Sequence, residues 1–532
     1  LYDNGAMSKY ATLTAISESP VEEGLLYTGS DDGLINVSED GGETWRQGAP
    51  LPGVPAQAFI NDVEASPRDP NVVFVAADAH KLGDYRPYLF RSDDRGRTWT
   101  SITGDLPETN IVWSVKQDHE DAKLLFIGAE YGMHFSYDRG EHWIKLGGGV
   151  PTIPFRDIEL HPRDNDLVGA SFGRGFYVLD DYSSLRELSQ AVVAEEASLF
   201  AVRDAWWYVP AVPMQAKGMP SQGSSSFRSD NPPFGALITY YLPSFPETAR
   251  AERQNEEKAM REQIADVPFP GWERLNSEFS EGAPQTLLII RDEAGEPVRW
   301  LKGTNGKGLH RINWDLRWPA PDPISLSKPA FQPPWAGEPQ GPLAAAGQYS
   351  VELYIAHNGK LIPQGEPQTF NLKAVPNLTA SVDFAAITSF QQETNELRRE
   401  ISSAGRQLSE ANKRLRHLDA ALLQTSNAEE SHFADLQSLN KRLGELRFTL
   451  FGDPQRRRLN ESNKPSISSR TFNASNNWST RQAPTQTNQE SLEIAKREFM
   501  EFEKALTQYL KDLAAFEVLL EAAGAPFTPG RG

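Results

Sequence analysis

Ser38-Glu39-Asp40-Gly41-Gly42-Glu43-Thr44-Trp45 is the stretch that decides the fold, because two further copies of its pattern follow along the chain. The second copy runs from Ser92 to Trp99, and the third runs from Ser136 to Trp143 with His142 in place of the Thr. The copies start 92 − 38 = 54 and 136 − 92 = 44 residues apart, which is close to the length of one propeller blade. The shared positions are Ser38, Asp40, Gly42, Thr44, Trp45, Ser92, Asp94, Gly96, Thr98, Trp99, Ser136, Asp138, Gly140 and Trp143.

Each copy has the chemistry of a closed turn between two strands. An Asp side chain accepts hydrogen bonds from backbone N–H groups a few residues on, and Gly supplies a positive φ. A short apolar strand precedes each copy, and a fourth unit at 158–181 repeats the strands with a decayed turn, Leu179-Asp180-Asp181. The sequence therefore predicts about four propeller blades over residues 1–190, with structural roles for the repeated residues. We expect the ring to be completed by blades before Leu1 or by a partner chain.

Several stretches resemble one known group, the exported bacterial proteins with BNR (Asp-box) repeats, which are related to the sortilin-type (VPS10-type) propeller. The resemblance is carried by the boxes and by 29–33 (Gly-Ser-Asp-Asp-Gly), 86–88 (Arg-Pro-Tyr), 172–181 (Phe-Gly-Arg-Gly-Phe-Tyr-Val-Leu-Asp-Asp) and 313–317 (Asn-Trp-Asp-Leu-Arg). Many members of the group are labelled "glycosyl hydrolase". The resemblance implies that this chain is the C-terminal half of a longer protein that is secreted, periplasmic or on the cell surface.

Two further regions follow the repeats. Residues 196–375 contain many short strands without boxes, separated by Gly and Pro turns, which predicts an immunoglobulin-like β-sandwich with insertions. Residues 384–523 carry apolar residues at alternating spacings of four and three, from Leu397 to Leu422, and two similar series after that. This pattern predicts a three-helix antiparallel bundle. The polar stretch 453–489 is expected to be a flexible loop that packs no core.

Composition excludes several classes of function. A net charge of −19 argues against nucleic acid as a partner and against docking on an anionic membrane, because both need a basic surface. The chain has no cysteine, which excludes disulfides, thiol nucleophiles and Cys-ligated metals. No apolar run approaches the length of a membrane span. The histidines show no zinc-binding spacing and no phosphate-binding loop is present, so neither a metal nor another cofactor is expected.

The candidate ligand-binding residues are those that interrupt the repeats. His80, Asp84, Tyr85 and Arg86 form a dense polar and aromatic cluster inside the second unit, and Arg174 lies between two glycines. A solvated hairpin or a tight turn would also explain these residues. No catalytic set is evident, so the sequence predicts an exported, non-catalytic propeller that binds a peptide, protein or glycan.

Two alternatives stay open. A glycoside hydrolase acting on a polysaccharide would need two carboxylates about 5 to 10 Å apart. The candidates for such a pair are Asp62, Asp84, Glu130 and Asp157, and their spacing in the sequence singles out no pair. The other alternative is a structural subunit of a cell-envelope assembly, which would use the helical tail to dock on other envelope proteins.

Overall fold

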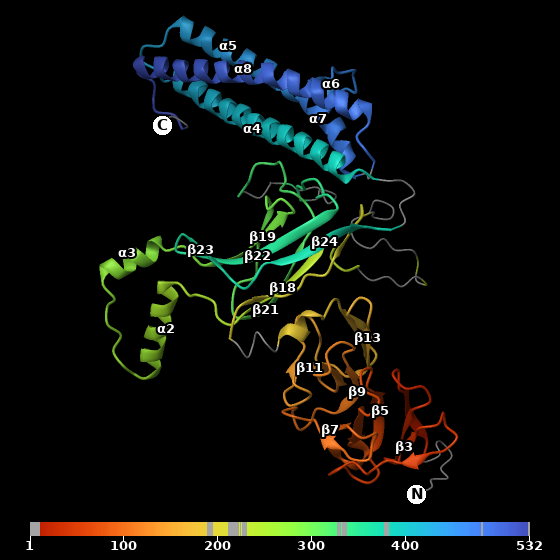
Figure 1. Ribbon diagram of the computed structural model, residues 1–532. Helices are drawn as coiled ribbons and strands as arrows, with labels where there is room; N and C mark the ends of the chain where they lie inside the picture. Colours follow the sequence, from red (N-terminus) through yellow and green to blue (C-terminus); the bar gives the residue numbers. More distant parts are fainter. Residues whose placement is uncertain are drawn as a thin grey trace. The chain divides into compact units, whose positions relative to one another are not determined.

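The computed structural model describes residues 11–188, 195–210, 223, 225, 231–326, 331, 338–376, 382–479 and 482–529. The chain divides into two compact units. Unit 1 comprises residues 1–201, 239–245 and 306–310, and unit 2 comprises residues 202–238, 246–305 and 311–532. The prediction of a mainly β chain with a helical C-terminal region is confirmed (Figure 1).

Unit 1 contains four antiparallel sheets, each with the up-and-down strand order of a propeller blade. The first sheet consists of β1 (Leu13–Glu18), β2 (Leu26–Ser30), β3 (Ile35–Ser38) and β4 (Arg46–Gln47). The second consists of β5 (Phe59–Ala65), β6 (Val73–Ala79), β7 (Asp84–Ser92) and β8 (Thr100–Ser101), with the 3-10 turn η1 (His80–Leu82) between β6 and β7. The third consists of β9 (Val112–Gln117), β10 (Leu125–Ala129), β11 (Gly132–Ser136) and β12 (Ile144–Lys145). The fourth has three strands, β13 (Phe155–His161), β14 (Asp166–Ser171) and β15 (Gly175–Leu179).

The first strands of these sheets lie side by side. Strand β5 lies against β1 and β9, and β9 lies against β13. Because every sheet repeats the same strand order, the hairpins between second and third strands gather at one end of the sheets, which we call the hairpin end. The boxes and the loops between first and second strands gather at the other end, which we call the box end.

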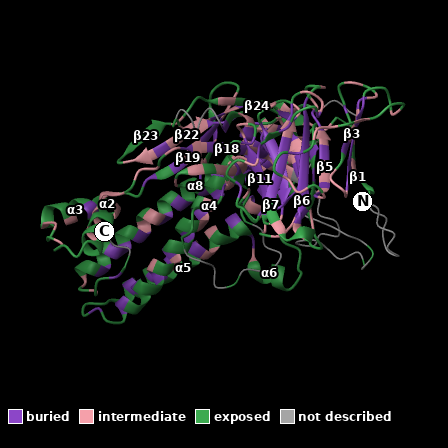
Figure 2. Cartoon of the chain, turned by 90° about the horizontal axis from the view of Figure 1, so that it is seen from below, coloured by how far each residue is buried: buried purple, intermediate pink, exposed green. Residues whose placement is uncertain are grey.

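Apolar side chains fill the space between consecutive sheets. Strand residues alternate between the two faces of a sheet, so one strand can supply two cores. Fully buried pairs across the three junctions are Tyr27 with Val75, Phe74 with Ile127, and Phe126 with Phe155. Burial of each such side chain contributes about 1.5–3 kcal/mol. Figure 2 shows these strands in purple, the colour of buried residues.

Unit 2 contains a larger sheet with the path β17 (Ala205–Trp207), β24 (Gln368–Ala374), β22 (Gly347–His357), β19 (Gln285–Asp292) and β20 (Pro297–Lys302), and β23 (Lys360–Pro363) pairs with β22. Only β17, against β24, is parallel among these described pairs. A separate sheet has the order β16 (Ser198–Leu199), β18 (Ala236–Leu242) and β21 (Gly308–Trp314). The charged stretch after β18 forms α2 (Ala249–Glu262), which is followed by α3 (Trp272–Ser280).

The C-terminal region contains three long helices, α4 (Phe384–Leu422), α5 (Glu430–Phe451) and α8 (Gln486–Ala522). Asp383 and Thr485 cap α4 and α8, each accepting a hydrogen bond from a backbone N–H of the first turn. In Figure 1, α5 runs antiparallel to α4, and α8 runs parallel to α4. Every predicted apolar position from Leu397 to Leu422 is buried in their shared core.

The structure corrects the expectation for residues 453–489. This stretch holds α6 (Pro454–Arg458), α7 (Ile467–Ser475) and the 3-10 turn η3 (Asn476–Ser479). Helix α7 packs on α8 and α4, and its residues Ile467 and Ala474 are 1% and 0% exposed in the core. The average polarity of the stretch hid a short amphipathic helix, because two or three apolar residues on one face are enough to bury it. Among the described residues, no helix is long and apolar enough to cross a membrane.

Candidate ligand-binding site

The boxes are built as closed turns, as their sequence predicts. In the second box, the Ser92 hydroxyl donates to Asp94 Oδ1 at 2.7 Å and accepts from the Gly96 N–H at 2.8 Å. Asp94 also accepts from the Thr98 N–H at 2.8 Å and from its hydroxyl at 2.7 Å. Burial acts to raise the pKa of Asp94, but the hydrogen bonds from Thr98 and Ser92 lower it to about 2. This carboxylate is fully used in holding the turn.

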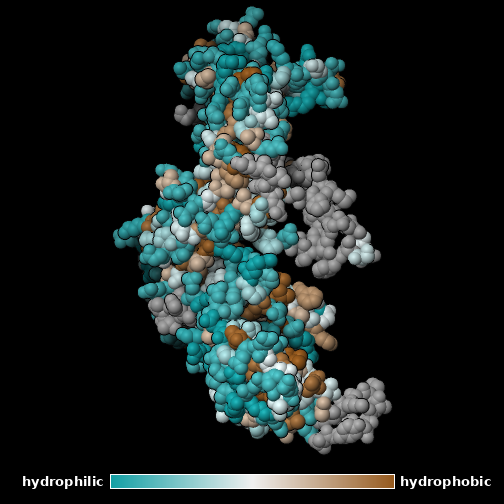
Figure 3. Space-filling view, turned by 45° about the vertical axis from the view of Figure 1, so that its right-hand side comes forward, coloured by the Kyte–Doolittle hydropathy of each residue, from teal (hydrophilic) through white to brown (hydrophobic). Residues whose placement is uncertain are grey.

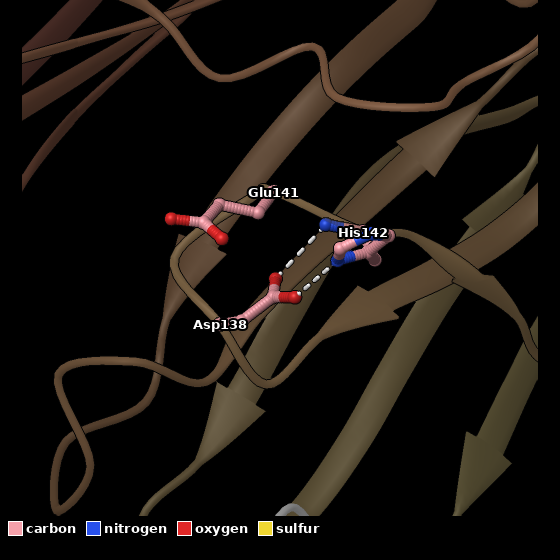
Figure 4. Close-up of side chains that lie close together, drawn as sticks. All are labelled: Asp138, Glu141 and His142. Carbon is pink, nitrogen blue, oxygen red and sulfur yellow. Dashed lines mark hydrogen bonds and ion pairs between the residues drawn. The ribbon is translucent and has the colours of Figure 1, made fainter.

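At the shared positions, the third box differs from the other two only in His142, which makes the hydrogen bonds to Asp138 that Thr makes in the other boxes (Figure 4). His142 donates its backbone N–H to Asp138 Oδ1 at 2.9 Å, and its Nδ1 lies 2.7 Å from Oδ2. The hydrogen bond and the negative charge of Asp138 raise the pKa of His142. Glu141 brings a third possible cation ligand within 4.8 Å of these atoms, but Asp138 and His142 already bind each other. The geometry is that of a turn, and we assign it no metal.

A β-bulge occurs at the same place in all four first strands. The pairing of each first strand with its second strand shifts at one residue, and the extra residues are Thr14, Asn61, Trp113 and Arg156. In the first two sheets the extra side chain ties neighbouring first strands together. Thr14 Oγ1 donates to the Ile60 carbonyl at 2.7 Å, and Asn61 Nδ2 donates to the Val112 carbonyl at 2.9 Å. Bulges re-aim side chains and are common next to functional sites.

In the third and fourth sheets, large side chains replace those short links. The Arg156 guanidinium lies 3.4 Å from the ring centroid of Trp113 and 5.3 Å from that of Phe172. The Trp113 indole N–H donates to Glu130 Oε2 at 3.0 Å. The His80 ring meets Trp113 edge-on at 6.0 Å between centroids. These residues form one connected cluster at the hairpin end, drawn from three sheets.

The predicted candidates divide between this cluster and a separate ion pair. His80 belongs to the cluster, and its ring Nδ1 bonds to Asp78. Asp84 instead accepts hydrogen bonds from Arg86 Nη2 at 2.7 Å and from the Tyr88 hydroxyl at 2.6 Å. The bond from Arg86, followed by that from Tyr88, holds the pKa of Asp84 far below its usual range. Tyr85 is 54% exposed in β7, and Arg174 lies in the β14–β15 hairpin, two residues after Phe172.

Each hairpin at this end also presents one exposed apolar side chain. The four residues, with their exposed fractions, are Leu34 (40%), Leu82 (56%), Tyr131 (45%) and Phe172 (68%). Scattered apolar residues on a surface are ordinary, but an exposed one in every hairpin of this end is a pattern that calls for a cause. Figure 3 shows apolar side chains, in brown, reaching the surface over the sheets in the lower part of the view.

Charged residues on the first strands form a second cluster. Lys116 Nζ lies 2.9 Å from Glu64 Oε2 and 3.4 Å from Glu159 Oε2. Asp62 accepts a hydrogen bond from the Val115 N–H at 2.9 Å. Burial raises the pKa of Asp62, and it raises that of Glu64 to about 7 although Lys116 opposes the shift. The Glu64 carboxyl can therefore hold a proton near neutral pH.

Sequence reasoning did not single out Trp113, Arg156 or Tyr131 as ligand-binding residues, whereas Phe172 starts the repeat-breaking stretch that contains Arg174. A signal for the first two was present, because aligning the four first strands places Leu-Thr-Ala-Ile, Ile-Asn-Asp-Val, Val-Trp-Ser-Val and Phe-Arg-Asp-Ile in register. The second position of this alignment changes from a small polar residue to Trp113 and then Arg156. A position that breaks a repeat after two regular copies is a functional candidate.

Comparison with known proteins gives partial matches only. No family model matches the chain. A curated relative, the xyloglucanase Xgh74A of Acetivibrio thermocellus, is 26% identical over 176 residues, which cover 30% of this chain and 20% of the relative. The match therefore spans about a fifth of the relative's length.

Two solved structures illustrate the structural comparison. The GH74 xyloglucanase from Xanthomonas campestris is 15% identical with a TM-score of 0.27, covering 66% of this chain and 45% of that one. YCF48 bound to D1 peptide is 16% identical with a TM-score of 0.26, covering 32% of this chain and 51% of that one. Scores this low do not by themselves establish a shared fold, so the up-and-down sheets and their boxes describe the architecture.

Proposed function

We propose that this chain is a non-catalytic binding protein whose hairpin end holds an extended peptide or glycan. One observation carries the proposal: the bulge position that links neighbouring strands through Thr14 and Asn61 is taken over by Trp113 and Arg156. The change replaces a hydrogen bond between neighbouring first strands by a stack of two large side chains, and it leaves the Arg156 guanidinium exposed for a further use. Binding a ligand at the end of the sheets is such a use.

The chemistry around these two residues suits a ligand with both polar and apolar surfaces. The exposed Arg156 guanidinium and the Glu130 carboxylate offer a donor and an acceptor. Tyr131, next to Glu130 in the chain, and Phe172, whose ring lies 5.3 Å from the Arg156 guanidinium, add exposed rings, and Leu82 is an exposed apolar side chain in the hairpin of the second sheet. A few polar groups set among aromatic side chains are typical of binding sites.

A binding assay with two kinds of probe tests the proposal. We would titrate the chain with xyloglucan oligosaccharides, because the curated sequence relative is a xyloglucanase, and screen it in parallel against an array of unrelated peptides. Tyr131→Ala and Phe172→Ala should each weaken binding of the successful probe about ten-fold, equivalent to about 1.4 kcal/mol. The matched control is Ile144→Ala, because Ile144 is 39% exposed on β12, away from the hairpins.

The outcome is decisive in either direction. Equal affinities for wild type, both aromatic variants and the control would show that binding does not use the hairpin end. Loss of binding in Ile144→Ala as well would point to damage of the sheet rather than to a contact. Binding of oligosaccharides but not peptides would select the glycan, and the reverse would select the peptide.

A glycoside hydrolase is the second candidate, favoured by the carboxylates on the first strands. Asp62 and Glu64 have raised pKa values because they are buried, and Asp157 lies close enough to Asp62 to add to its shift. A carboxyl group that keeps its proton near pH 7 can serve as a general acid. Release of reducing ends from xyloglucan, abolished by Asp62→Asn or Asp157→Asn, would replace the binding-only proposal.

We propose the finer assignments together with this function. They are membership of the sortilin-like BNR group, a secreted, periplasmic or cell-surface location, propeller blades over 1–190, an immunoglobulin-like sandwich over 196–375 and a three-helix bundle over 384–523. The sheets with boxes support membership of the BNR group and the blades over 1–190, and the shared helical core supports the bundle over 384–523. In the envelope-assembly alternative, deletion of 384–523 would release a partner that otherwise co-purifies; retention of every partner would count against it.

A further inference from the structure

The burial and hydrogen bonding of the tryptophan that ends each box depend on whether another sheet precedes its own. Trp99 and Trp143 are both 8% exposed, and each donates its indole N–H to a carbonyl just after the fourth strand of the preceding sheet. The Trp99 bond to Ala49 is 2.9 Å long, and the Trp143 bond to Ile102 is 3.0 Å long. A box tryptophan is therefore covered and hydrogen-bonded when another blade lies in front of it.

Trp45 ends an otherwise equivalent box but has neither feature. It is 45% exposed, and its indole N–H turns back to the Gly42 carbonyl of its own turn at 3.1 Å. The sequence of the box does not explain the difference, because Ser38, Asp40 and Thr44 make the same closing bonds as their counterparts. The difference lies in what stands in front of the first sheet.

The first strand shows the same contrast at two more positions. The residue before each bulge and the second residue after it face the preceding sheet. In the second, third and fourth sheets these residues are almost fully buried: Ile60 0%, Val63 2%, Val112 0%, Val115 0%, Phe155 0% and Ile158 1%. In the first sheet the corresponding residues, Leu13 and Ile16, are 62% and 71% exposed. Leu13, Ile16 and Trp45 are thus residues of the type that is buried between two sheets elsewhere, but on the first sheet they are exposed.

We propose that this surface (Leu13, Ile16 and Trp45) docks a further four-stranded Asp-box blade. Such a blade would cover the two aliphatic side chains with its own apolar face. It would also present the carbonyl that follows its fourth strand to the Trp45 indole N–H. We expect the apolar cover because all three junctions between sheets in the structure have it, and we expect the carbonyl because Trp99 and Trp143 each bind one.

A second copy of this chain does not supply such a blade. The back faces of the first three sheets are already covered by the sheets that follow them, so among the described sheets of unit 1 only the fourth has no following sheet against its back face. In the part of the chain that the structure describes, that sheet consists of β13, β14 and β15, without a fourth strand after β15 to offer the carbonyl. The occupant is therefore a blade outside the described residues.

Photo-crosslinking of the native protein in its source cells tests the proposal. A photoreactive amino acid would replace Ile16, and in a matched control it would replace Tyr85, which is 54% exposed at the hairpin end. We expect crosslinks from position 16 to a peptide that contains, or directly follows, a Ser-x-Asp-x-Gly-x-Thr-Trp box outside this sequence. Position 85 should give no such crosslink. Oxidative labelling should modify Trp45 several-fold faster than Trp99 in the isolated chain, and at an equal, low rate in the native protein.

Three results would overturn the proposal. They are crosslinks from position 16 to β14 or β15 of another copy, crosslinks to a peptide without a box, and unchanged labelling of Trp45 in the native protein. Trp45→Phe gives an independent measurement, because it removes the N–H and one ring of the indole while keeping an aromatic side chain. It should lower the unfolding temperature of the native protein more than that of the isolated chain, where the N–H makes only an exposed bond to the Gly42 carbonyl; equal effects on both would also contradict the proposal.

Discussion

Replacing His134 should remove an acid sensitivity from the third sheet. His134 lies in β11, is 5% exposed and pairs with Lys145 of β12. Among the described residues its Nδ1 has no hydrogen-bond partner. Burial lowers the pKa of His134 from 6.5 to about 4, with the positive charge of Lys145 acting in the same direction.

The sign and size of the effect follow from proton linkage. Between pH 6.5 and pH 4 the unfolded chain binds a proton at this histidine and the folded protein does not, so stability falls as the pH falls through this window. The difference between 6.5 and about 4, at 1.36 kcal/mol per pKa unit, gives a loss of about 3 kcal/mol in the acid limit. At pH 7 and above the contribution is absent.

Urea unfolding of wild type and His134→Gln at half-unit steps from pH 7.5 to pH 4.5 measures this term. Glutamine is polar and of similar size but does not titrate, so the difference between the two proteins isolates the histidine. The variant should gain about 2.5 kcal/mol relative to wild type between pH 7.5 and pH 4.5, most of the acid-limit value. A difference that stays constant with pH would refute the reasoning.

His142→Thr provides a contrast of opposite sign at a nearby position. The pKa of His142 is raised by Asp138, so its contribution is present below pH 6.5 and is lost as the pH rises through the folded-state pKa. The threonine restores the residue of the other two boxes and removes the titration. Relative to wild type, this variant should be less stable at acidic pH than at alkaline pH.

Further predictions concern single hydrogen bonds and one ion pair. Ser92→Ala should cost about 1–3 kcal/mol in chemical unfolding, because the buried hydroxyl closes the second box; an unchanged midpoint would contradict this. Trp99→Phe should cost about 1 kcal/mol, whereas Trp45→Phe in the isolated chain should cost nothing measurable, and equal costs would be contrary to expectation. Glu517→Gln should cost about 3 kcal/mol in guanidinium unfolding, because it leaves Arg414 of α4 half-buried without its carboxylate; a neutral result would mean that water replaces the pair.

Local chemistry explains which features could be predicted from the sequence. The boxes are predictable because each turn is closed by residues within eight positions of one another. The apolar series from Leu397 to Leu422 is predictable because helix periodicity alone places it on one face. The candidate cluster is different, since His80 meets Trp113 and Trp113 meets Arg156 only when three sheets come together. Asp84 and Arg86 appear near His80 in the sequence, but their mutual ion pair removes them from that cluster.

Helix α7 could not be predicted from the sequence, although it is a local element. Its stretch reads as polar on average, and only the position of Ile467 and Ala474 against α8 gives it a place in the core. Composition measures a whole segment, whereas burial depends on one face of it. Periodicity over a short helix is too brief a signal to separate from chance.

The side-by-side arrangement of the first strands has a consequence for folding. Each sheet of unit 1 packs on its sequence neighbours, in the order first, second, third and fourth, so cooperativity passes between adjacent sheets as it does in repeat proteins. Opening of one junction leaves the remaining junctions intact. The first and fourth sheets each pack on one neighbouring sheet, so unfolding should start at the ends of the row, and the amides of the first sheet should exchange with solvent sooner than those of β6 or β10.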